Sequence, residues 1–262
     1  MKTALTIAGS DPSGGAGLQA DLKTFSAHGV YGMSVITSLT SQNTTGVTGV
    51  FDVPLEVVTS QIDAVFTDIF PDSVKIGMVS SSEIISVIAE KLTAHNAKNI
   101  VLDTVMLSTS GHTLLKPDAI DALTSLLFPL ADIITPNLYE AQILCGFDIH
   151  SESDMIKSAE FIYHKYNVNV LLKGGHLAGT SNDLLFDGNI AWFEGKKIDN
   201  PNTHGTGCTL SSAIAANLAC GFDIKTAVKN SKGYISGAIG DMLNLGSGRG
   251  PLNHMYKFFP NK

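Results

Sequence analysis

The stretch "ALTIAGSDPSGGAGLQADLKT" (residues 4–24) indicates the fold class, because it joins an apolar run to a helical pattern through a glycine-rich loop. Residues 4–9 are mostly apolar, which is typical of a strand covered on both faces. Beyond the loop, Leu18, Leu22 and Phe25 recur at helical spacing. A strand, a loop and a helix in this order form the repeating unit of a parallel sheet.

The same alternation continues along most of the chain. Further apolar runs predict strands at "SVITSL" (34–39), "VKIGMV" (74–79), "NIVLDTV" (99–105), "DIITP" (132–136) and "NVLLKG" (169–174). Helical patterns cover residues 58–65, 84–92, 151–166, 206–220 and 223–240. Residues 184–198 contain the turn pairs Asp187-Gly188 and Glu194-Gly195 between short apolar runs, which predicts an antiparallel edge. We therefore predict an α/β fold in a single domain, residues 1–262, with a mostly parallel central sheet and a small antiparallel edge.

Composition limits the class of protein. The 262 residues are 44% hydrophobic and 16% charged, which is enough to bury a core. A net charge of −7 with scattered lysines and arginines argues against a nucleic-acid partner. Three cysteines without metal-ligand spacing indicate neither a disulfide framework nor a zinc site. Neither a secretion signal nor a membrane-spanning run is found, so we expect a cytoplasmic protein without a membrane partner.

The glycine loop that follows the first strand has two readings. Its glycines either make a tight turn or bring the backbone close to a ligand, but no GK[ST] closes a phosphate-binding P-loop and no full GxGxxG is present. Asp21 lies one helical turn beyond the glycines. An aspartate inside a helix is usually solvated, so the loop alone does not make Asp21 a ligand-binding residue.

Polar residues follow three of the predicted strands. Asp103, Glu140 and Lys173 stand at or just beyond strand ends, which meet at one edge of a parallel sheet where ligands bind. Two acids there suit Mg²⁺ held through water beside phosphates, and the lysine suits a phosphate. The alternative is structural: Asn137 and Glu140 fit a helix start, and Lys173 fits a solvated surface.

A second glycine turn precedes the helix predicted at 206–220. In "NTHGTGCTLSSAIAANLACG" (202–221), Gly205, Thr206, Gly207 and Cys208 place successive backbone N–H groups at a helix N-terminus, which attracts anions. The same field is expected to lower the pKa of the Cys208 thiol, so that it serves as a nucleophile or a base. The alternative is a small buried cysteine beside a turn.

These motifs, taken together, resemble a known family. The sequence is similar over essentially its whole length to the hydroxymethylpyrimidine and phosphomethylpyrimidine kinases of thiamine biosynthesis, which belong to the ribokinase-like superfamily. Besides the stretches already quoted, the resemblance rests on "KIGMV", "VLDTVMLSTSG", "ITPNLYEA", "LKGGH" and "GRGPLNH". It implies a ribokinase-like three-layer α/β/α sandwich, a homodimer, and ATP-dependent phosphorylation of the pyrimidine hydroxymethyl group and then of the monophosphate, with Mg²⁺.

The resemblance also implies roles for individual residues. Gly205, Thr206 and Gly207 match the anion hole, and Cys208 matches the base. The residues matching contacts to the pyrimidine or its pocket are Gly9, Asp21, Gln42, Met78 and Val105. Asp103 and Glu140 match the magnesium-linked acids, and Asn137 and Lys173 fall in segments associated with ATP.

One departure and two alternatives accompany this reading. Thr109 stands where relatives commonly have a lysine in a flap, so handling of the monophosphate or of ATP is expected to weaken. Pyridoxal kinase is the nearest alternative, because pyridoxal also carries a hydroxymethyl group on a heteroaromatic ring. Gln42 favours the pyrimidine, since a carboxamide both donates to and accepts from an aminopyrimidine edge. A non-catalytic binder of thiamine precursors is the remote alternative.

Overall fold

The computed structural model describes residues 1–106, 117–175 and 181–259, and strands from all three ranges form one sheet. Within these residues the sheet has nine strands in the order β3-β2-β1-β4-β5-β6-β7-β8-β9. The strands are β1 (Thr3–Ser10), β2 (Tyr31–Asn43), β3 (Gly46–Asp52), β4 (Ser73–Ile76), β5 (Ile100–Leu102), β6 (Ile133–Ile134), β7 (Asn169–Leu172), β8 (Asp183–Phe186) and β9 (Ile190–Phe193). The six central strands, β2, β1, β4, β5, β6 and β7, are parallel to one another. The outer strands β3, β8 and β9 pair antiparallel with their neighbours.

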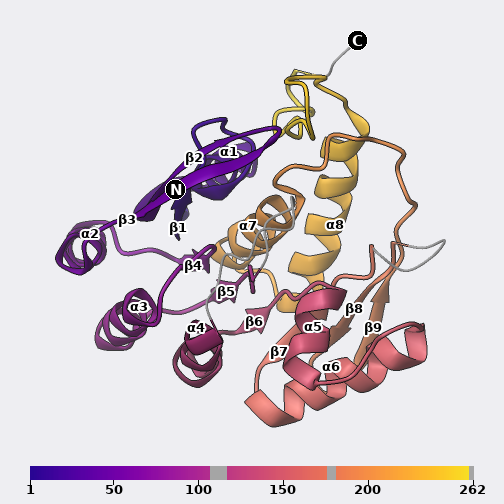
Figure 1. Ribbon diagram of the computed structural model, residues 1–262, viewed down its shortest axis with the longest axis horizontal. Helices are drawn as coiled ribbons and strands as arrows, with labels where there is room; N and C mark the ends of the chain where they lie inside the picture. The colour runs from indigo at the N-terminus through magenta and orange to yellow at the C-terminus, as the bar shows by residue number, and fades with distance from the viewer. Residues whose placement is uncertain (107–116, 176–180, 260–262) are drawn as a thin grey trace.

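Helices cover both faces of this sheet (Figure 1). One face carries α1 (Gly17–Ala27), α7 (Thr206–Ala219) and α8 (Ile224–Gly240). The other face carries α2 (Leu55–Asp68), α3 (Ser82–Ala94), α4 (Pro117–Ala122) with the turns η1 (Leu123–Leu127) and η2 (Phe128–Leu130), α5 (Leu138–Cys145) and α6 (Glu152–Tyr166). This is the three-layer arrangement expected when each parallel strand is followed by a crossover helix.

Two hydrophobic clusters, one on each face of the sheet, form the core. Helix α7 contacts β1, β4, β5, α1 and α8, and its residues from Thr209 to Ala219 are all buried. Small residues such as Ala213 and Ala216 let the neighbouring elements approach it closely. A helix buried all round is held in place by its neighbours, so the orientation of its first turn is fixed.

The structure confirms the predicted parallel strands and the antiparallel edge, and it adds elements that the pattern did not indicate. The hairpin turn at Asp187-Gly188 joins β8 to β9, but the prediction at Glu194-Gly195 is wrong, because residues 194–203 contain no strand. Strand β3 was missed because it lies at the other edge of the sheet and its seven residues mix two glycines with the apolar residues Val47, Val50 and Phe51. The helix α4 was also missed.

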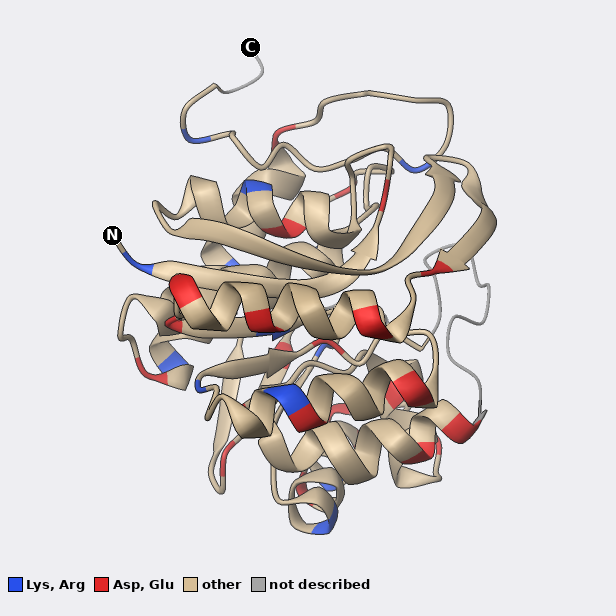
Figure 2. Cartoon of the chain, turned by 90° about the vertical axis from the view of Figure 1, so that its left-hand side faces the viewer, with Lys and Arg blue, Asp and Glu red and all other residues tan. Residues whose placement is uncertain are grey.

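Parallel register brings the ends of the central strands to one edge of the sheet. Asp103 directly follows β5, and Thr135 and Lys173 directly follow β6 and β7. Acidic and basic residues are scattered along the outer helices, and the cartoon in Figure 2 shows no continuous run of basic residues along them. In the described part of the chain, no helix combines the length and apolar character that crossing a membrane requires.

Candidate active site

A cavity of about 910 Å³ opens at the carboxyl ends of the parallel strands. All but one of the site residues expected from the sequence line it. They are Gly9, Gln42, Met78, Asp103, Val105, Asn137, Glu140, Lys173, Gly205, Thr206, Gly207 and Cys208. The fold therefore gathers into one space residues that the sequence spreads over two hundred positions, in agreement with the rule that such sheets bind ligands at this edge.

The first turn of α7 forms one wall of the cavity. Gly205 precedes the helix with φ 79° and ψ 11°, a left-handed conformation that favours glycine. Any side chain on Gly205 would collide with the carbonyl oxygen of Gly15, so the two glycine-rich loops touch backbone to backbone. A side-chain carbon on Gly207 would lie 3.5 Å from Asp103 Oδ2 and 3.6 Å from Lys173 Nζ. The amides of this turn are thus beside both a carboxylate and an ammonium group.

Asp103 and Lys173 form an ion pair of 3.2 Å between Nζ and Oδ1. Burial raises the pKa of Asp103, but the nearby ammonium groups of Lys173 and Lys75 outweigh burial and lower its pKa below the usual value. Burial lowers the pKa of Lys173, yet Asp103 and Glu140 outweigh burial and raise it. Asp103 is therefore an ionised carboxylate and Lys173 a fixed cation beside the glycine turn that precedes Cys208.

Glu140 has two structural partners as well as a place in the cavity. Its Oε2 accepts hydrogen bonds from the Asn137 backbone N–H (2.8 Å) and the Thr104 hydroxyl (3.0 Å), while Asn137 Oδ1 accepts from the Glu140 N–H. Asn137 and Glu140 thereby form a capping box at the start of α5, as the structural alternative predicted. Burial, partly offset by Lys173, raises the pKa of Glu140.

The two acids suit a magnesium ion that keeps most of its other ligands from phosphate and water. One oxygen of each acid has only a long hydrogen bond: Ser211 Oγ lies 3.3 Å from Asp103 Oδ2, and the Met106 backbone N lies 3.4 Å from Glu140 Oε1. Lys173 supplies one positive charge to two carboxyl groups, so a divalent cation fits the charge and the oxygen donor set. No group of three or more His, Cys, Asp or Glu residues among those described is arranged to hold a metal without such additional ligands.

Cys208 departs from the expectation based on its position. Burial raises the pKa of its thiol to about 11; Lys75 opposes this shift, while Asp21 and Asp103 add to it. The expected lowering of the pKa is therefore wrong in direction. The helix N-terminus contributes a favourable field, but burial together with the carboxylates of Asp21 and Asp103 outweighs it.

The opposite wall of the cavity is suited to a flat ring. A side-chain carbon on Gly9 would come within 2.9 Å of Met78 Cε and 2.8 Å of Ser38 Oγ, so only glycine leaves the space that lies over Met78 open. Val105 adds an apolar surface, and Gln42, partly buried on β2, adds a carboxamide. Two apolar side chains with one polar group are typical of a site for a heteroaromatic ring.

Asp21 is the site residue that the structure does not bring to the cavity. Its carboxylate is fully buried and binds Lys75 Nζ at 2.8 and 2.9 Å. It also accepts hydrogen bonds from the hydroxyls of Thr6 (2.6 Å) and Ser212 (2.5 Å). Its contact with the pyrimidine stays a prediction, while its visible partners join four elements of the fold.

The sequence reading missed a further pair. His204 Nε2 lies 2.8 Å from Asp11 Oδ2, and both residues line the cavity. The signal was present, because His204 directly precedes the glycine turn and Asp11 lies in the first strand–helix loop. Lys75 was missed too, although a lysine inside an apolar strand indicates a buried cation with a partner. The Thr109 departure and His176 of "LKGGH" lie outside the described residues.

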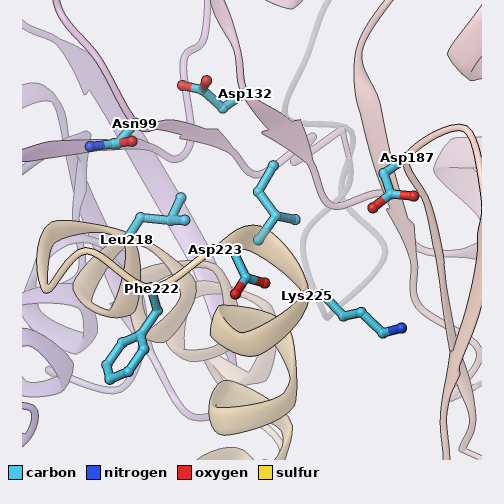
Figure 3. Close-up of a pocket in the computed structure, with 8 residues that line it drawn as sticks. Asn99, Asp132, Asp187, Leu218, Phe222, Asp223 and Lys225 are labelled. Atoms are coloured by element: carbon cyan, nitrogen blue, oxygen red, sulfur yellow. The ribbon is translucent and has the colours of Figure 1, made fainter.

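A second, smaller cavity of about 390 Å³ is lined by Asn99 and Asp132, which directly precede β5 and β6, and by Asp223 at the start of α8 (Figure 3). Its acids have structural roles: Asp132 accepts from the Ile100 N–H, Asp187 from the Asn189 N–H, and Asp223 caps α8. Asn99 donates to the Asp72 carbonyl. This cavity therefore does not compete with the larger one as the active site.

Fold and site together define a ribokinase-like enzyme that transfers a phosphoryl group from ATP. A sequence profile described as phosphomethylpyrimidine kinase matches residues 11–253, and the chain belongs to that family. It is 51% identical to the hydroxymethylpyrimidine/phosphomethylpyrimidine kinase of Rhizobium meliloti, over 98% of both chains.

Solved structures agree with this assignment. The crystal structure of phosphomethylpyrimidine kinase from Clostridium difficile 630 is 51% identical, with a TM-score of 0.82 over 91% of this chain and 100% of that chain. An ADP complex of Bacillus subtilis pyridoxal kinase is 38% identical, with a TM-score of 0.89 over 97% of this chain and 98% of that chain. The resemblance noted from the motifs is confirmed at the level of the family.

Proposed function

We propose that this chain phosphorylates the hydroxymethyl group of 4-amino-5-hydroxymethyl-2-methylpyrimidine, and then the resulting monophosphate, for thiamine biosynthesis. One observation carries the proposal. The amide turn at Gly205–Gly207 and the Asp103–Lys173 pair share a single cavity with the ring-sized surface of Gly9, Met78 and Gln42. Phosphoryl transfer needs alignment and charge stabilisation more than covalent chemistry, and this arrangement supplies both.

Each group has a role in the proposed reaction. The amides of the turn bind the transferred phosphoryl group, and Lys173 balances its charge. Asp103 and Glu140 would hold Mg²⁺ through water, and the ion would supply positive charge beside the phosphates. The thiolate form of Cys208 receives the proton of the attacking hydroxyl and becomes the neutral thiol, while Asn137 contacts ATP. Apolar residues from α7, α8 and the preceding loop (Ile198, Leu210, Ile235 and Ile239) line a further part of the cavity and suit the adenine base.

The chain is proposed to act as a homodimer in the cytoplasm, with each copy a single domain. The family resemblance is the support for the dimer. Light scattering coupled to size-exclusion chromatography is expected to give twice the mass of one 27.7 kDa chain. A single-chain mass at micromolar protein concentration would contradict it.

The test of the function is a product assay with ATP, Mg²⁺ and three acceptors in parallel: hydroxymethylpyrimidine, its monophosphate and pyridoxal. Turnover of both pyrimidines is expected, with a lower kcat/KM for pyridoxal. Omission of Mg²⁺ is expected to abolish turnover. Phosphorylation of the first pyrimidine without the second would restrict the proposal to one step.

Pyridoxal phosphorylation is the second candidate. It is favoured by the close superposition on the Bacillus subtilis pyridoxal kinase at 38% identity. Both ring ligands present a hydroxymethyl group, so the phosphate end of the cavity does not distinguish them. Turnover of pyridoxal alone in the same assay would replace the first proposal by this one.

A further inference from the structure

Gln42 belongs to a chain of hydrogen-bonding groups that the proposed phosphoryl transfer does not use. Its carboxamide Nε2 lies 3.3 Å from His204 Nε2, and its Oε1 lies 3.2 Å from the Thr40 hydroxyl. At the two ends of the chain, His204 Nε2 lies 2.8 Å from Asp11 Oδ2 and Thr40 donates to the Ser10 carbonyl at 2.8 Å. All five residues line the cavity.

The proton of His204 is fixed by its partner. Asp11 Oδ2 also accepts from the Ala16 backbone N–H at 2.8 Å, and Oδ1 accepts from the Ser13 backbone N–H and hydroxyl at 2.9 and 2.8 Å. This is the environment of an ionised carboxylate. A bare nitrogen lone pair 2.8 Å from that carboxylate would be repelled, so His204 Nε2 carries the hydrogen and donates to Asp11.

The number of available hydrogens then determines the orientation of the Gln42 carboxamide. Two N–H donors do not bond to each other, so the group of Gln42 that faces His204 Nε2 is the carboxamide oxygen. The nitrogen then faces Thr40, whose hydroxyl hydrogen is already given to the Ser10 carbonyl and whose oxygen can accept. In this orientation the single His204 N–H is shared between Asp11 at 2.8 Å and the Gln42 oxygen at 3.3 Å, and the Gln42 nitrogen donates to Thr40. The reverse orientation places donor against donor at His204 and acceptor against acceptor at Thr40.

We propose that His204, held by Asp11, is a positioning residue that determines specificity through Gln42. His204 fixes which end of the Gln42 carboxamide is the oxygen and which is the nitrogen. The carboxamide can then pair, in a single orientation, with a ring that has an acceptor nitrogen next to an amino group. The inference rests on the proposed function and adds the reason why an aminopyrimidine is preferred over pyridoxal, which has no amino group beside its ring nitrogen.

The imidazole is itself held rigidly enough to act in this way. Its residue is 7% exposed, and its backbone N–H donates to the Gly250 carbonyl at 3.2 Å. A side-chain carbon on Gly15 would lie 2.5 Å from the His204 ring, so the glycine leaves the space that the imidazole fills. The ring is therefore clamped between the first loop and the C-terminal segment.

The first test compares His204→Phe with His204→Gln. Phenylalanine keeps the ring but removes the N–H, so the KM for hydroxymethylpyrimidine is expected to rise about ten- to a hundredfold while kcat and the KM for ATP change much less. Glutamine restores a donor and is expected to recover most of the loss. His95→Phe, which changes a histidine paired with the exposed Asp63, is the matched control and should leave all three constants unchanged.

The second test combines His204→Phe with Gln42→Met. If His204 acts through Gln42, the double variant has the same pyrimidine KM as Gln42→Met alone. Additive losses, or a loss in kcat or ATP affinity instead, would show that His204 acts through the adjacent glycine turn and would overturn the inference. If the wild type does not turn over the pyrimidine, both the proposed function and the inference about His204 are overturned.

A third variant keeps the inference testable if the His204 variants do not fold. Gln42→Glu accepts from His204 but has no N–H to offer the ring nitrogen, so its pyrimidine KM should rise clearly above the wild-type value and toward that of Gln42→Met. If Gln42→Glu has the KM of the wild type, the claim that the Gln42 N–H donates to the ring is wrong.

Discussion

The thiol of Cys208 lies at the start of α7, where the helix field alone would favour a thiolate. Burial instead raises its pKa to about 11, so the thiol is protonated at neutral pH in the free enzyme. A base with this pKa works better as the pH rises, because a larger fraction is deprotonated.

The expected result is a rate that follows this titration. Between pH 7 and pH 9, kcat/KM of the wild type should rise roughly tenfold per pH unit, and Cys208→Ala should lower kcat by about two to four decades and flatten the profile. Cys208→Asp should recover part of the rate at pH 7. Near-normal kcat in the alanine variant would remove the base role and leave catalysis to the amides.

Asp11 gives a second prediction at the scale of one residue. Burial raises its pKa, but hydrogen bonds from His204, Ser13 and Ala16 outweigh burial and lower it from 3.8 to about 2. The folded state therefore favours the ionised form, so the stabilisation is present above pH 4 and is lost as the pH falls toward 2.

The contribution amounts to about 2 kcal/mol at neutral pH. Urea unfolding of wild type and Asp11→Asn should differ by about that free energy at pH 6 and by roughly half of it at pH 3. A difference independent of pH would mean that the lost hydrogen-bond geometry, and not the charge, causes the destabilisation.

At the scale of the element, the two ends of α7 carry glycines in left-handed conformations but in different surroundings. A side-chain carbon on Gly205 (φ +79°) would collide with the Gly15 carbonyl. A side-chain carbon on Gly221 (φ +87°), just after the helix, would meet none of the described atoms within 4 Å. Backbone strain is common to both sites, and collision is confined to Gly205.

Alanine substitutions separate the two effects. Gly221→Ala should cost about 1 kcal/mol of stability and keep full activity, since only strain is added. Gly205→Ala should cost more than about 2 kcal/mol and lose phosphoryl transfer, because the first turn of α7 must move away from the first loop. Equal costs in urea unfolding, with activity retained in both, would contradict the close approach of the two loops.

At the scale of the whole molecule, the Lys75–Asp21 pair joins β4 to α1, while Thr6 of β1 and Ser212 of α7 bind the same carboxylate. Neither charged side chain is exposed. Burial lowers the pKa of Lys75, but Asp21 outweighs burial and raises it above the usual value. The cost of leaving one member unpaired is therefore large.

Lys75→Met should reduce the free energy of unfolding by about 3–5 kcal/mol, and adding Asp21→Asn should restore most of it. Lys91→Met, which breaks the partly exposed pair with Asp63, is the matched control and should cost less than about 1 kcal/mol. A stable double variant also tests the predicted ring contact of Asp21, because the pyrimidine KM rises only if that carboxylate reaches the substrate.

Local pattern was sufficient for much of this protein. Apolar runs such as residues 74–79 and 169–174 indicated buried parallel strands, and the rule for strand ends placed Asp103, Glu140 and Lys173 at one edge. Long ordered motifs identified the family. These features are legible because the period of the pattern and the residues that end each strand are properties of short segments.

Only the tertiary structure decided how distant segments share their charges and hydrogens. It reversed the expected pKa shift of Cys208, kept Asp21 with Lys75 and away from the cavity, and brought His204 to Asp11 and Gln42. Each of these outcomes depends on burial and on partners far away in the sequence, and desolvation and Coulomb energies arise only when those groups are brought together.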